Sequence, residues 1–441
     1  MTKYCICGMG RSGQSALEIL YNKKDLFYLF DEDETKLRDI FQSNKKHQNI
    51  FIINNITKEL LIDFDKIILS PSFSINDKRF ILFKDKIISE LELGYKNNKN
   101  KLIAITGTNG KTTTTSLISH ILSCAKINNI ACGNIGLPLS SVSKKNIVKV
   151  CEVSSFQLEA THKFCPNIAC LLNVTPDHLD RHKSIRNYTK IKYKIFENMQ
   201  KNSYAIINSN LPIPKNTKSR IYTFGKKANN ACYISGECYV FCKNNKEQIV
   251  CKTSVSSLVG LFNQENIMCA IIVAKLMGVK NDIISKFLAT YKACEHRMKC
   301  VYRSKKISVY DDSKATNIDA CLRAIQSFQS RQNICLILGG SDKNTDFDLL
   351  IKKLPQNVSK IIAVGGVRKK IISSIKRTKC HIKYLSFPTL NIATRYALMS
   401  LRSGVLLLSP ACASFDEFSS YAERGEKFIK YVNSYFLEKQ K

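Results

Sequence analysis

Short apolar runs and amphipathic stretches alternate along most of this chain. The runs at residues 3–7, 26–30, 66–70 and 87–90 end at or near glycine, aspartate, proline or glutamate, and a helical pattern of apolar positions follows the first run at residues 14–20. The same alternation returns later, with apolar runs at residues 102–106, 131–132, 147–153, 168–174, 307–311, 333–338, 360–364 and 404–408. Because strands separated by helices form parallel sheets, the pattern predicts an α/β fold.

Three interruptions of this alternation divide the chain. A polar stretch at residues 95–101 lacks any apolar period, and a connector occupies residues 291–298. Between residues 203 and 253 short apolar runs are broken by Asn, Pro and Gly, which predicts antiparallel strands appended to a central domain. We therefore expect three domains: a Rossmann-like domain at 1–97, a central P-loop ATPase-like parallel sheet at 98–296 and a second Rossmann-like domain at 297–441.

Residues 102–122 combine an apolar run, a glycine-bearing loop and a helical pattern. The loop reads Gly107-Thr108-Asn109-Gly110-Lys111-Thr112, with its first glycine closer to the lysine than in the usual G-x-x-x-x-G-K-[ST] pattern. Glycines let backbone N–H groups approach phosphate oxygens, the lysine offsets phosphate charge, and the threonine hydroxyl can hold Mg²⁺. The segment predicts a nucleoside triphosphate site, against the alternative of a turn that binds nothing.

A second glycine turn follows the first predicted strand. Gly8, Gly10 and Gly13 have the G-x-G-x-x-G spacing, and Asp31 follows the next strand directly. In a strand–helix–strand unit this arrangement suits a dinucleotide or a diphosphate-sugar nucleotide.

Polar side chains also gather where later strands end, and open α/β sheets bind ligands there. Glu152 and His178 are candidates for a shared divalent-metal site. Taken singly, Glu152 is equally a surface charge, Lys192 an exposed helix charge and Asn263 a helix cap, so these alternatives stay open.

Two strand ends of the last domain carry polar groups of the same kind. Residues 312–317 offer an acid, hydroxyls and a base, and polar residues recur at 409–416. These segments suit a second face of the nucleotide site that closes over it by domain motion.

Composition narrows the setting. The chain has 441 residues, 44% of them hydrophobic, and shows no run of about 18 uncharged apolar residues and no separate export segment, so we expect a cytoplasmic protein without membrane insertion. The 18 cysteines are scattered, and we interpret them as reduced core residues. The net charge of +33 is spread through all regions, which favours a compositional bias over nucleic-acid binding.

Taken together, these motifs resemble the Mur ligases of bacterial cell-wall synthesis along essentially the whole chain, and most closely the members that add D-glutamate. The segments that carry the resemblance are the phosphate loop, Gly133 to Gly136, Glu152 to Leu158, Asn173 to His178, Glu295 to Arg297, Asp312 to Asn317 and Ser409 to Phe415. Several independent motifs in the right order are more specific than any one of them.

The resemblance implies a role for each matching residue. It assigns catalysis to Lys111, Asn134, His178 and Lys192, and metal binding to Thr112, Glu152, His178 and Lys192, the last as a CO2 adduct (carbamate) that holds a second Mg²⁺. It implies ATP contacts from Gly107, Thr108, Asn109, Gly110, Lys111, Thr112, Thr113, Asn263, Asn266, Arg297, Asp312 and Lys314. It implies substrate contacts from Gly8, Gly10, Arg11, Ser12, Gly13, Asp31, Ser70, Asn134 and Ser154, and a D-glutamate site formed by Thr316, Lys343, Ser414, Phe415 and Tyr421.

The implied reaction joins D-glutamate to UDP-N-acetylmuramoyl-L-alanine at the expense of ATP, in peptidoglycan precursor synthesis. The L-alanyl carboxylate attacks the γ-phosphate, and the D-glutamate amine attacks the resulting acyl phosphate. The resemblance further implies two Mg²⁺ ions, with Mn²⁺ as a substitute, and a monomer. Two departures from the family pattern are Phe262, where a His is usual, and Ser72, where a Gly is usual.

Other hypotheses account for only part of the sequence. An NAD-dependent dehydrogenase would explain the turn at Gly8 to Gly13 and Asp31, and a nucleotide-dependent switch protein would explain the phosphate loop without catalysis. Within the superfamily, the alternatives are other amino-acid-adding ligases and folylpolyglutamate synthases. The N-terminal glycine turn and Ser409 to Phe415 favour D-glutamate.

Overall fold

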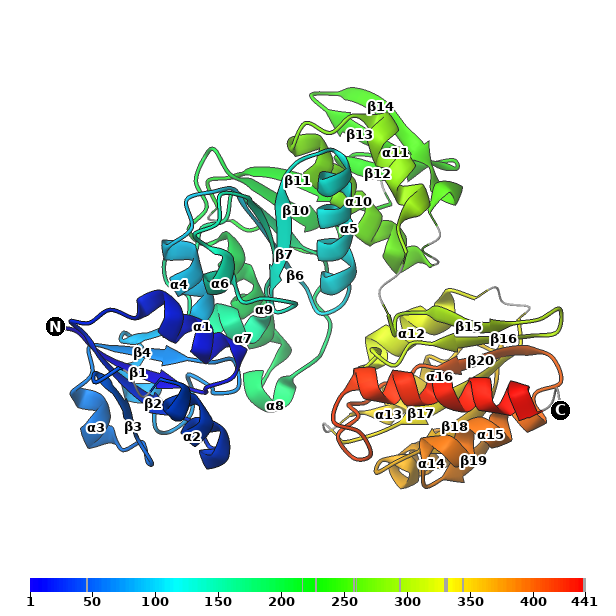
Figure 1. Cartoon of the computed structure of the whole chain (residues 1–441). Coiled ribbons are helices and arrows are strands. Elements are labelled where there is room, and N and C mark those ends of the chain that lie inside the picture. The colour runs from blue at the N-terminus through cyan, green and yellow to red at the C-terminus, as the bar shows by residue number, and fades with distance from the viewer. Residues whose placement is uncertain are drawn as a thin grey trace. The chain divides into compact units, whose positions relative to one another are not determined.

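Three sheets follow one another along the chain (Figure 1). The computed structural model describes all residues except 45–46, 216, 227, 257, 259, 293–294, 329–331, 343–344 and 439–441. Unit 1, which comprises Met1–Val174, Arg181–Val255 and Glu265–Ala289, holds the first two sheets; unit 2, which comprises Thr175–Asp180, Ser256–Gln264 and Thr290–Lys441, holds the third. The α/β architecture with three sheets agrees with the prediction, and the exact boundaries at 97/98 and 296/297 stay predictions.

The first sheet is wholly parallel, in the order β3-β2-β1-β4-β5. Its strands are β1 (Lys3–Cys7), β2 (Leu26–Phe30), β3 (Ile50–Ile52), β4 (Lys66–Leu69) and β5 (Ile87–Ser89), and its helices are α1 (Arg11–Leu20), α2 (Glu34–Ser43), α3 (Lys58–Ile62) and α4 (Glu90–Lys96). Central strand β1 is apolar at every position from Cys5 to Cys7, all fully buried. A parallel strand covered on both faces requires such a continuous apolar run, and its carboxyl end delivers the first glycine turn.

The second sheet has nine strands in the order β14-β13-β12-β11-β10-β9-β6-β8-β7. Its strands are β6 (Leu102–Thr106), β7 (Asn129–Gly133), β8 (Val148–Glu152), β9 (Ile168–Leu171), β10 (Tyr204–Asn208), β11 (Arg220–Phe224), β12 (Cys232–Ser235), β13 (Cys238–Lys243) and β14 (Lys246–Lys252). The helices along this part of the chain are α5 (Lys111–Cys124), α6 (Leu139–Val142), α7 (Ser155–Glu159), α8 (Leu179–His182), α9 (Ile185–Tyr193), α10 (Leu261–Leu276) and α11 (Asn281–Thr290). Strand β6 lies between β9 and β8, which brings their carboxyl ends beside the phosphate loop.

The prediction of antiparallel strands throughout residues 203–253 is wrong for the first two strands. Strand β10 pairs in parallel with both β9 and β11, and only β12, β13 and β14 form an antiparallel meander. Short apolar runs broken by Asn, Pro and Gly mark where strands end but do not give their direction. Direction is set instead by the connection between β10 and β11, which returns the chain to the start of the sheet.

The first two sheets are joined by buried polar links within unit 1. The Arg181 guanidinium donates to the carbonyl oxygens of Pro71 (2.5 Å) and Phe73 (2.7 Å) and pairs with Glu159 at 2.6 Å. Glu90 accepts a hydrogen bond from the Ser140 N–H at 2.6 Å, and burial raises the pKa of this carboxyl even though that bond lowers it. The two sheets therefore meet through hydrogen-bonded polar groups as well as apolar contacts, although the second carboxylate oxygen of Glu90 is buried without a hydrogen-bond partner among the described residues.

The third sheet has the order β15-β16-β20-β17-β18-β19 and is parallel except for the edge strand β15. Its strands are β15 (Lys299–Arg303), β16 (Ile307–Asp311), β17 (Ile334–Gly339), β18 (Val358–Val364), β19 (Lys383–Phe387) and β20 (Gly404–Leu408). Its helices are α12 (Ile318–Gln326), α13 (Phe347–Lys352), α14 (Arg368–Arg377), α15 (Leu390–Ser400) and α16 (Tyr421–Glu438). Among the described helices of the whole chain, none is both long enough and apolar enough to cross a bilayer.

Candidate active site

The phosphate loop connects β6 to α5 and is held by Asn173, which follows β9. The Thr108 N–H donates to the backbone carbonyl of Asn173 at 3.0 Å, and the Asn109 N–H donates to the side-chain oxygen of Asn173 at 2.9 Å. The side-chain amide of Asn173 donates in turn to the Asn109 carbonyl at 3.0 Å. Gly110 then enters the helix with φ of +87°, a left-handed conformation that favours glycine. The loop is thus fixed by the strand next to it.

Two lysines meet at one oxygen of this loop. The Lys111 ammonium donates to the carbonyl oxygens of Gly107 and Thr108, both at 2.8 Å. Lys192, on α9, is only 1% exposed and also donates to the Gly107 oxygen at 2.8 Å. Its ammonium lies 4.5 Å from the ring centroid of Tyr188. Lys192 is therefore not the exposed helix charge that its lysine-rich neighbours suggest, but a buried group at the phosphate loop.

Glu152 ends β8 one strand away from the loop. It is 2% exposed and is paired in register with Ile105, two residues before Gly107. One carboxylate oxygen accepts a hydrogen bond from the Asn134 amide at 2.8 Å, and the other is buried without a hydrogen-bond partner. The alternative of a surface charge is excluded for this residue.

The chemistry of this corner fits a divalent cation. A buried carboxylate oxygen without a hydrogen-bond partner is available to coordinate a cation. In proteins, Mg²⁺ is usually bound by one or two carboxylates plus substrate phosphates. No group of three or more His, Cys, Asp or Glu side chains is placed to hold a metal in the part of the chain that the structure describes. Binding of Mg²⁺ by Glu152 and the Thr112 hydroxyl, together with ATP oxygens, stays a prediction.

Asn266 of α10 closes the other side of the loop within unit 1. It is buried, and a Cβ added at Gly110 would lie 2.4 Å from its Oδ1 atom. Asn263 belongs to unit 2, where its backbone N–H donates to the Gly260 carbonyl. Its predicted ATP contact, like the pairing of Glu152 with His178, joins the two units and stays a prediction.

Ser154 is the N-cap of α7. It forms a capping box with Gln157, whose N–H reaches the serine hydroxyl at 3.2 Å. The hydroxyl also donates to the Gln157 side chain at 3.0 Å. Its predicted substrate contact would thus be added to a structural role.

The N-terminal glycine turn opens on a cavity of about 650 Å³. Six of the predicted substrate residues line it: Gly8, Gly10, Arg11, Ser12, Asp31 and Ser70. Ser72, the departure from the family pattern, lies on the same wall. Gly13 does not line the cavity, because its α-carbon packs against the turn itself: an added Cβ would lie 2.1 Å from the Gly8 carbonyl oxygen.

Asp31 is one of the charged residues that line that cavity. Its carboxylate accepts hydrogen bonds from the Met9 N–H at 2.6 Å and from the Lys36 ammonium at 2.9 Å. Burial alone would raise the pKa of Asp31, but the hydrogen bonds from Lys36, Asp33 and Met9 outweigh it and hold the pKa below its usual range. The acid is therefore ionised at neutral pH.

In unit 2, Asp312 lies buried just after β16. It accepts hydrogen bonds from the Ser409 hydroxyl at 2.9 Å and the Met298 N–H at 3.2 Å. Burial raises the pKa of Asp312 to about 7, although Ser409 and the nearby Arg297 guanidinium lower it. The buried Arg297 Nε has no hydrogen-bond partner among the described residues, so this pair retains unused polar capacity.

The predicted D-glutamate residues fall in different surroundings. The ring centroid of Tyr421 lies 4.7 Å from the ammonium of Lys314, a predicted ATP contact. Ser414 is buried and Phe415 is 72% exposed. Lys343 lies outside the described residues.

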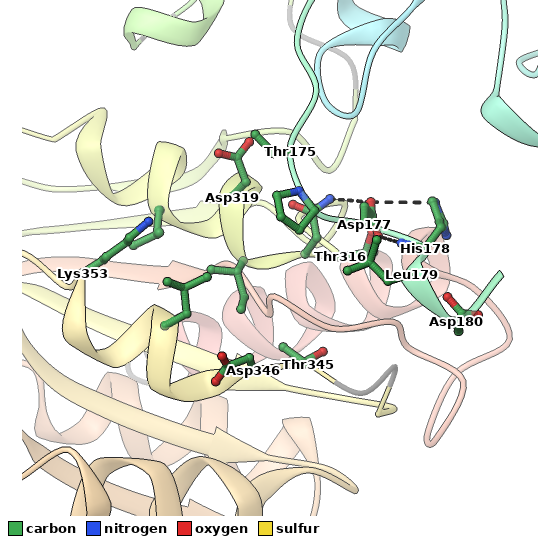
Figure 2. Close-up of a pocket in the computed structure, with 15 residues that line it drawn as sticks. Thr175, Asp177, His178, Leu179, Asp180, Thr316, Asp319, Thr345, Asp346 and Lys353 are labelled. Atoms are coloured by element: carbon green, nitrogen blue, oxygen red, sulfur yellow. Dashed lines mark hydrogen bonds and ion pairs between the residues drawn. The ribbon is translucent and has the colours of Figure 1, made fainter. Parts of the chain in front are cut away.

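Thr316 and His178 line one cavity of about 440 Å³ within unit 2. Figure 2 shows Asp177 beside His178, and Asp177 accepts hydrogen bonds from the Asn317 amide at 2.8 Å and the His178 N–H at 2.9 Å. Among the titratable side chains that line this cavity, the acids Asp177, Asp180, Asp319 and Asp346 outnumber the bases His178 and Lys353. Of the predicted D-glutamate residues, only Thr316 is in its lining.

Residues around these sites that received no individual role in the sequence analysis are mainly those that hold others in place. Asn173 was quoted within a motif but given no role, and its position at the end of a strand next to the loop was the available signal. Lys36 and Arg79, which line the N-terminal cavity, lie on segments without a motif. Only their approach in the folded chain identifies them.

Known proteins are similar to this chain over nearly its whole length. Residues 105–274 match the Mur ligase middle domain, and residues 296–412 match the Mur ligase glutamate ligase domain. The UDP-N-acetylmuramoylalanine–D-glutamate ligase of Caldicellulosiruptor bescii is 35% identical, over 97% of this chain and 96% of that protein. The chain belongs to the Mur ligase family. A ligase of the same name from a Thermoanaerobacter species is 36% identical to this Mur ligase, over 98% of both chains.

Solved structures share the fold of this Mur ligase at lower identity. The ADP complex of the MurF ligase from Thermotoga maritima has a TM-score of 0.65 and 16% identity, over 95% of this chain and 97% of its own. UDP-N-acetylmuramate–alanine ligase MurC from the same organism has a TM-score of 0.60 and 16% identity, over 98% of this chain. At such identities the likeness concerns the fold alone.

Proposed function

We propose that this Mur ligase joins D-glutamate to UDP-N-acetylmuramoyl-L-alanine in an ATP-dependent reaction of peptidoglycan precursor synthesis. The full-length similarity to ligases of that name supports the choice of substrates. The observation that carries the chemistry is the meeting of Lys111 and Lys192 at the Gly107 oxygen, with the Glu152 carboxylate on the neighbouring strand.

The chain's own groups suit formation of an acyl phosphate. Lys111 would turn from the loop carbonyls to the transferred phosphoryl group and offset its charge, while loop N–H groups at the start of α5 hold the phosphates. Mg²⁺ bound by Thr112 and Glu152 would supply further charge neutralisation there. Asn134, which donates to Glu152, would orient that carboxylate.

Lys192 would act as a carbamate. The ammonium groups of Lys111 and Lys192 share one carbonyl oxygen and repel each other, so a carbamate at Lys192 would turn that repulsion into attraction. A neutral amine adds to CO2 with loss of one proton, and the resulting carbamate carries a negative charge. The reaction would replace a repelled cation by an oxygen ligand for a second Mg²⁺.

Substitution of Lys192 tests this role. Lys192→Ala should lose phosphate release, and short carboxylates such as formate or acetate should restore part of it by occupying the vacated space. Lys190→Ala, an exposed lysine on the same helix, is the matched control and should keep full activity. A folded Lys192→Ala protein that binds ATP and Mg²⁺ but gains nothing from carboxylates would contradict the missing-ligand account.

The remaining site residues would take the roles that the family resemblance implies. The N-terminal cavity would receive the uridine diphosphate end of the acceptor, Asn263, Arg297, Asp312 and Lys314 would contact ATP, and Thr316, Lys343, Ser414, Phe415 and Tyr421 would hold D-glutamate. His178 would complete the metal site when the units close on ATP. We further propose a cytoplasmic monomer, which light scattering of the purified protein would check.

The deciding experiment measures phosphate release from ATP and Mg²⁺ with UDP-N-acetylmuramoyl-L-alanine, adding D-glutamate, L-lysine, diaminopimelate or L-alanine in separate tubes. Release with D-glutamate alone is the expected result. Release with another amine would keep a ligase and change its substrate. ATP binding without release in any tube would favour the nucleotide-switch hypothesis instead.

A further inference from the structure

The carboxyl ends of three neighbouring strands of the third sheet are tied to one buried side chain. Arg424, in the first turn of α16, is 3% exposed. Its guanidinium donates to the Ser313 hydroxyl (2.9 Å), to the carbonyl oxygens of Ser313 (2.8 Å), Cys412 (3.0 Å) and Ala413 (3.0 Å), and more weakly to that of Gly339 (3.5 Å). These oxygens follow β16 or β20 or end β17, which are adjacent in the sheet.

Burying the guanidinium of Arg424 costs free energy, which argues that its contacts have a structural role. All five partners are uncharged oxygens, so the buried cation gains no ion pair from them, and burial lowers the pKa of Arg424 to about 10. A cation in the first turn of a helix also opposes the helix dipole. At neutral pH the group nevertheless stays protonated and keeps its donors.

The neighbouring backbone needs such a brace. Ala411 has φ of +57°, a left-handed conformation that is unfavourable for alanine, and it directly precedes two of the carbonyls that Arg424 holds. The helix comes close enough for this because the next residue is glycine: a Cβ at Gly425 would lie 2.1 Å from Nδ1 of His296. The loop after β20 therefore contains a strained residue, Ala411, and the Arg424 guanidinium holds the two carbonyls that follow it.

We propose that Arg424 is a positioning residue, which holds the loops after β16, β17 and β20 in the arrangement that binds ATP and D-glutamate. This inference rests on the proposed function, because those loops carry Asp312, Lys314, Thr316 and Ser414. Arginine is required, since its planar fork reaches three loops at once, whereas a lysine ammonium is a single point donor.

The test compares Arg424→Lys and Arg424→Ala with the wild type. We expect kcat/KM for D-glutamate to fall about tenfold to a hundredfold, the loss that a misplacement of about 1 Å produces, and the KM for D-glutamate to rise. The KM for the UDP-linked acceptor should stay unchanged, because unit 1 would bind it. Guanidinium ion should restore part of the activity of Arg424→Ala. Arg395→Lys is the matched control, an exposed arginine on α15 paired with Glu438.

A structural role alone would give a different pattern. If Arg424→Lys only lowered the melting temperature and the apparent kcat, with every KM unchanged, or if it matched the wild type within about twofold, the positioning role would be wrong. Hydrogen exchange of the backbone at residues 312–317 and 409–416 should quicken in both variants. This readout needs no activity, so it tests the brace even if the wild type releases no phosphate with D-glutamate, the outcome that would refute the proposed function itself.

Discussion

The two glycine loops that open helices α1 and α5 look alike in sequence but differ in backbone. Gly10, the N-cap of α1, has φ of −70°, whereas Gly110, the N-cap of α5, has φ of +87°. A Cβ at Gly110 would lie 2.4 Å from the Asn266 side chain, but at Gly10 the nearest atom is the Lys36 ammonium at 3.9 Å. Glycine at 110 is demanded by the fold, while glycine at 10 keeps space open in the cavity.

The loops also differ in charge. In the first loop the Met9 N–H donates to the carboxylate of Asp31, whereas in the second loop two lysine ammonium groups donate to backbone carbonyls. Similar glycine spacing thus supports different chemistry, and substitutions can separate the two.

The largest effect should come from Lys111→Ala in the second loop. Loss of the cation that offsets phosphoryl charge should lower kcat by about a thousandfold or more. Phosphate release measures this, and binding of the UDP-linked acceptor in the first loop's cavity should be unchanged. The control is Lys101→Ala, an exposed lysine just before β6. Wild-type turnover by Lys111→Ala would remove the assignment of this loop to phosphate transfer.

A smaller effect should distinguish the two N-cap glycines. Gly110→Ala forces an alanine into a left-handed conformation against Asn266, so we expect a loss of about 1–3 kcal/mol in the free energy of unfolding. Gly10→Ala should change that free energy by less than about 0.5 kcal/mol, yet raise the KM for the UDP-linked acceptor by intruding on the cavity. Urea unfolding measures the free energy of unfolding of both variants. Equal losses in the two would show that the difference in backbone conformation between Gly10 and Gly110 is unimportant.

The smallest effect concerns the pH dependence of Asp31. Because its pKa is lowered in the folded protein, it contributes stability above the unfolded pKa of about 3.9, and that stability is lost as pH falls through the lower folded pKa. Asp31→Asn should therefore melt below the wild type at pH 7, with the difference closing in acid. Melting curves from pH 7 to pH 2 would show this, with Asp39→Asn, an exposed acid on α2, as the control. A difference that persisted unchanged in acid would mean that Asp31 acts by shape and not by charge.

Much of the fold could be predicted because its central strands are continuous apolar runs. Strands β1, β2, β16 and β20 have their predicted bounds. Three edge strands escaped prediction: β3 has only three residues, β15 follows an unpatterned connector, and β19 is largely exposed along Lys383–Phe387. Short or exposed strands gain their order from pairing with a neighbour, which a local pattern does not contain.

The site divides in the same way. The phosphate loop was predictable because strand, glycines and helix are contiguous, whereas Lys192 was identified only by resemblance. Because Lys190 and Lys194 lie beside it, the sequence pattern made Lys192 look like one of several exposed lysines. Tyr188, Ile191 and Lys192 nevertheless have the spacing of one buried helix face. Arg424 and Arg181 gave no local signal at all, since their partners lie far away along the chain.

The links that Arg181 and Glu90 make between the first two sheets should make the two sheets fold as one unit. A fragment ending near residue 97 would carry a carboxylate whose only described donor is the Ser140 N–H, and it would bare the apolar flank of α4, so it should not fold as a free-standing module. Heat should melt the two sheets in one cooperative step. A swap of the first sheet between related ligases would succeed only if its partner surface within unit 1, residues 139–160 with Arg181, were exchanged together with it.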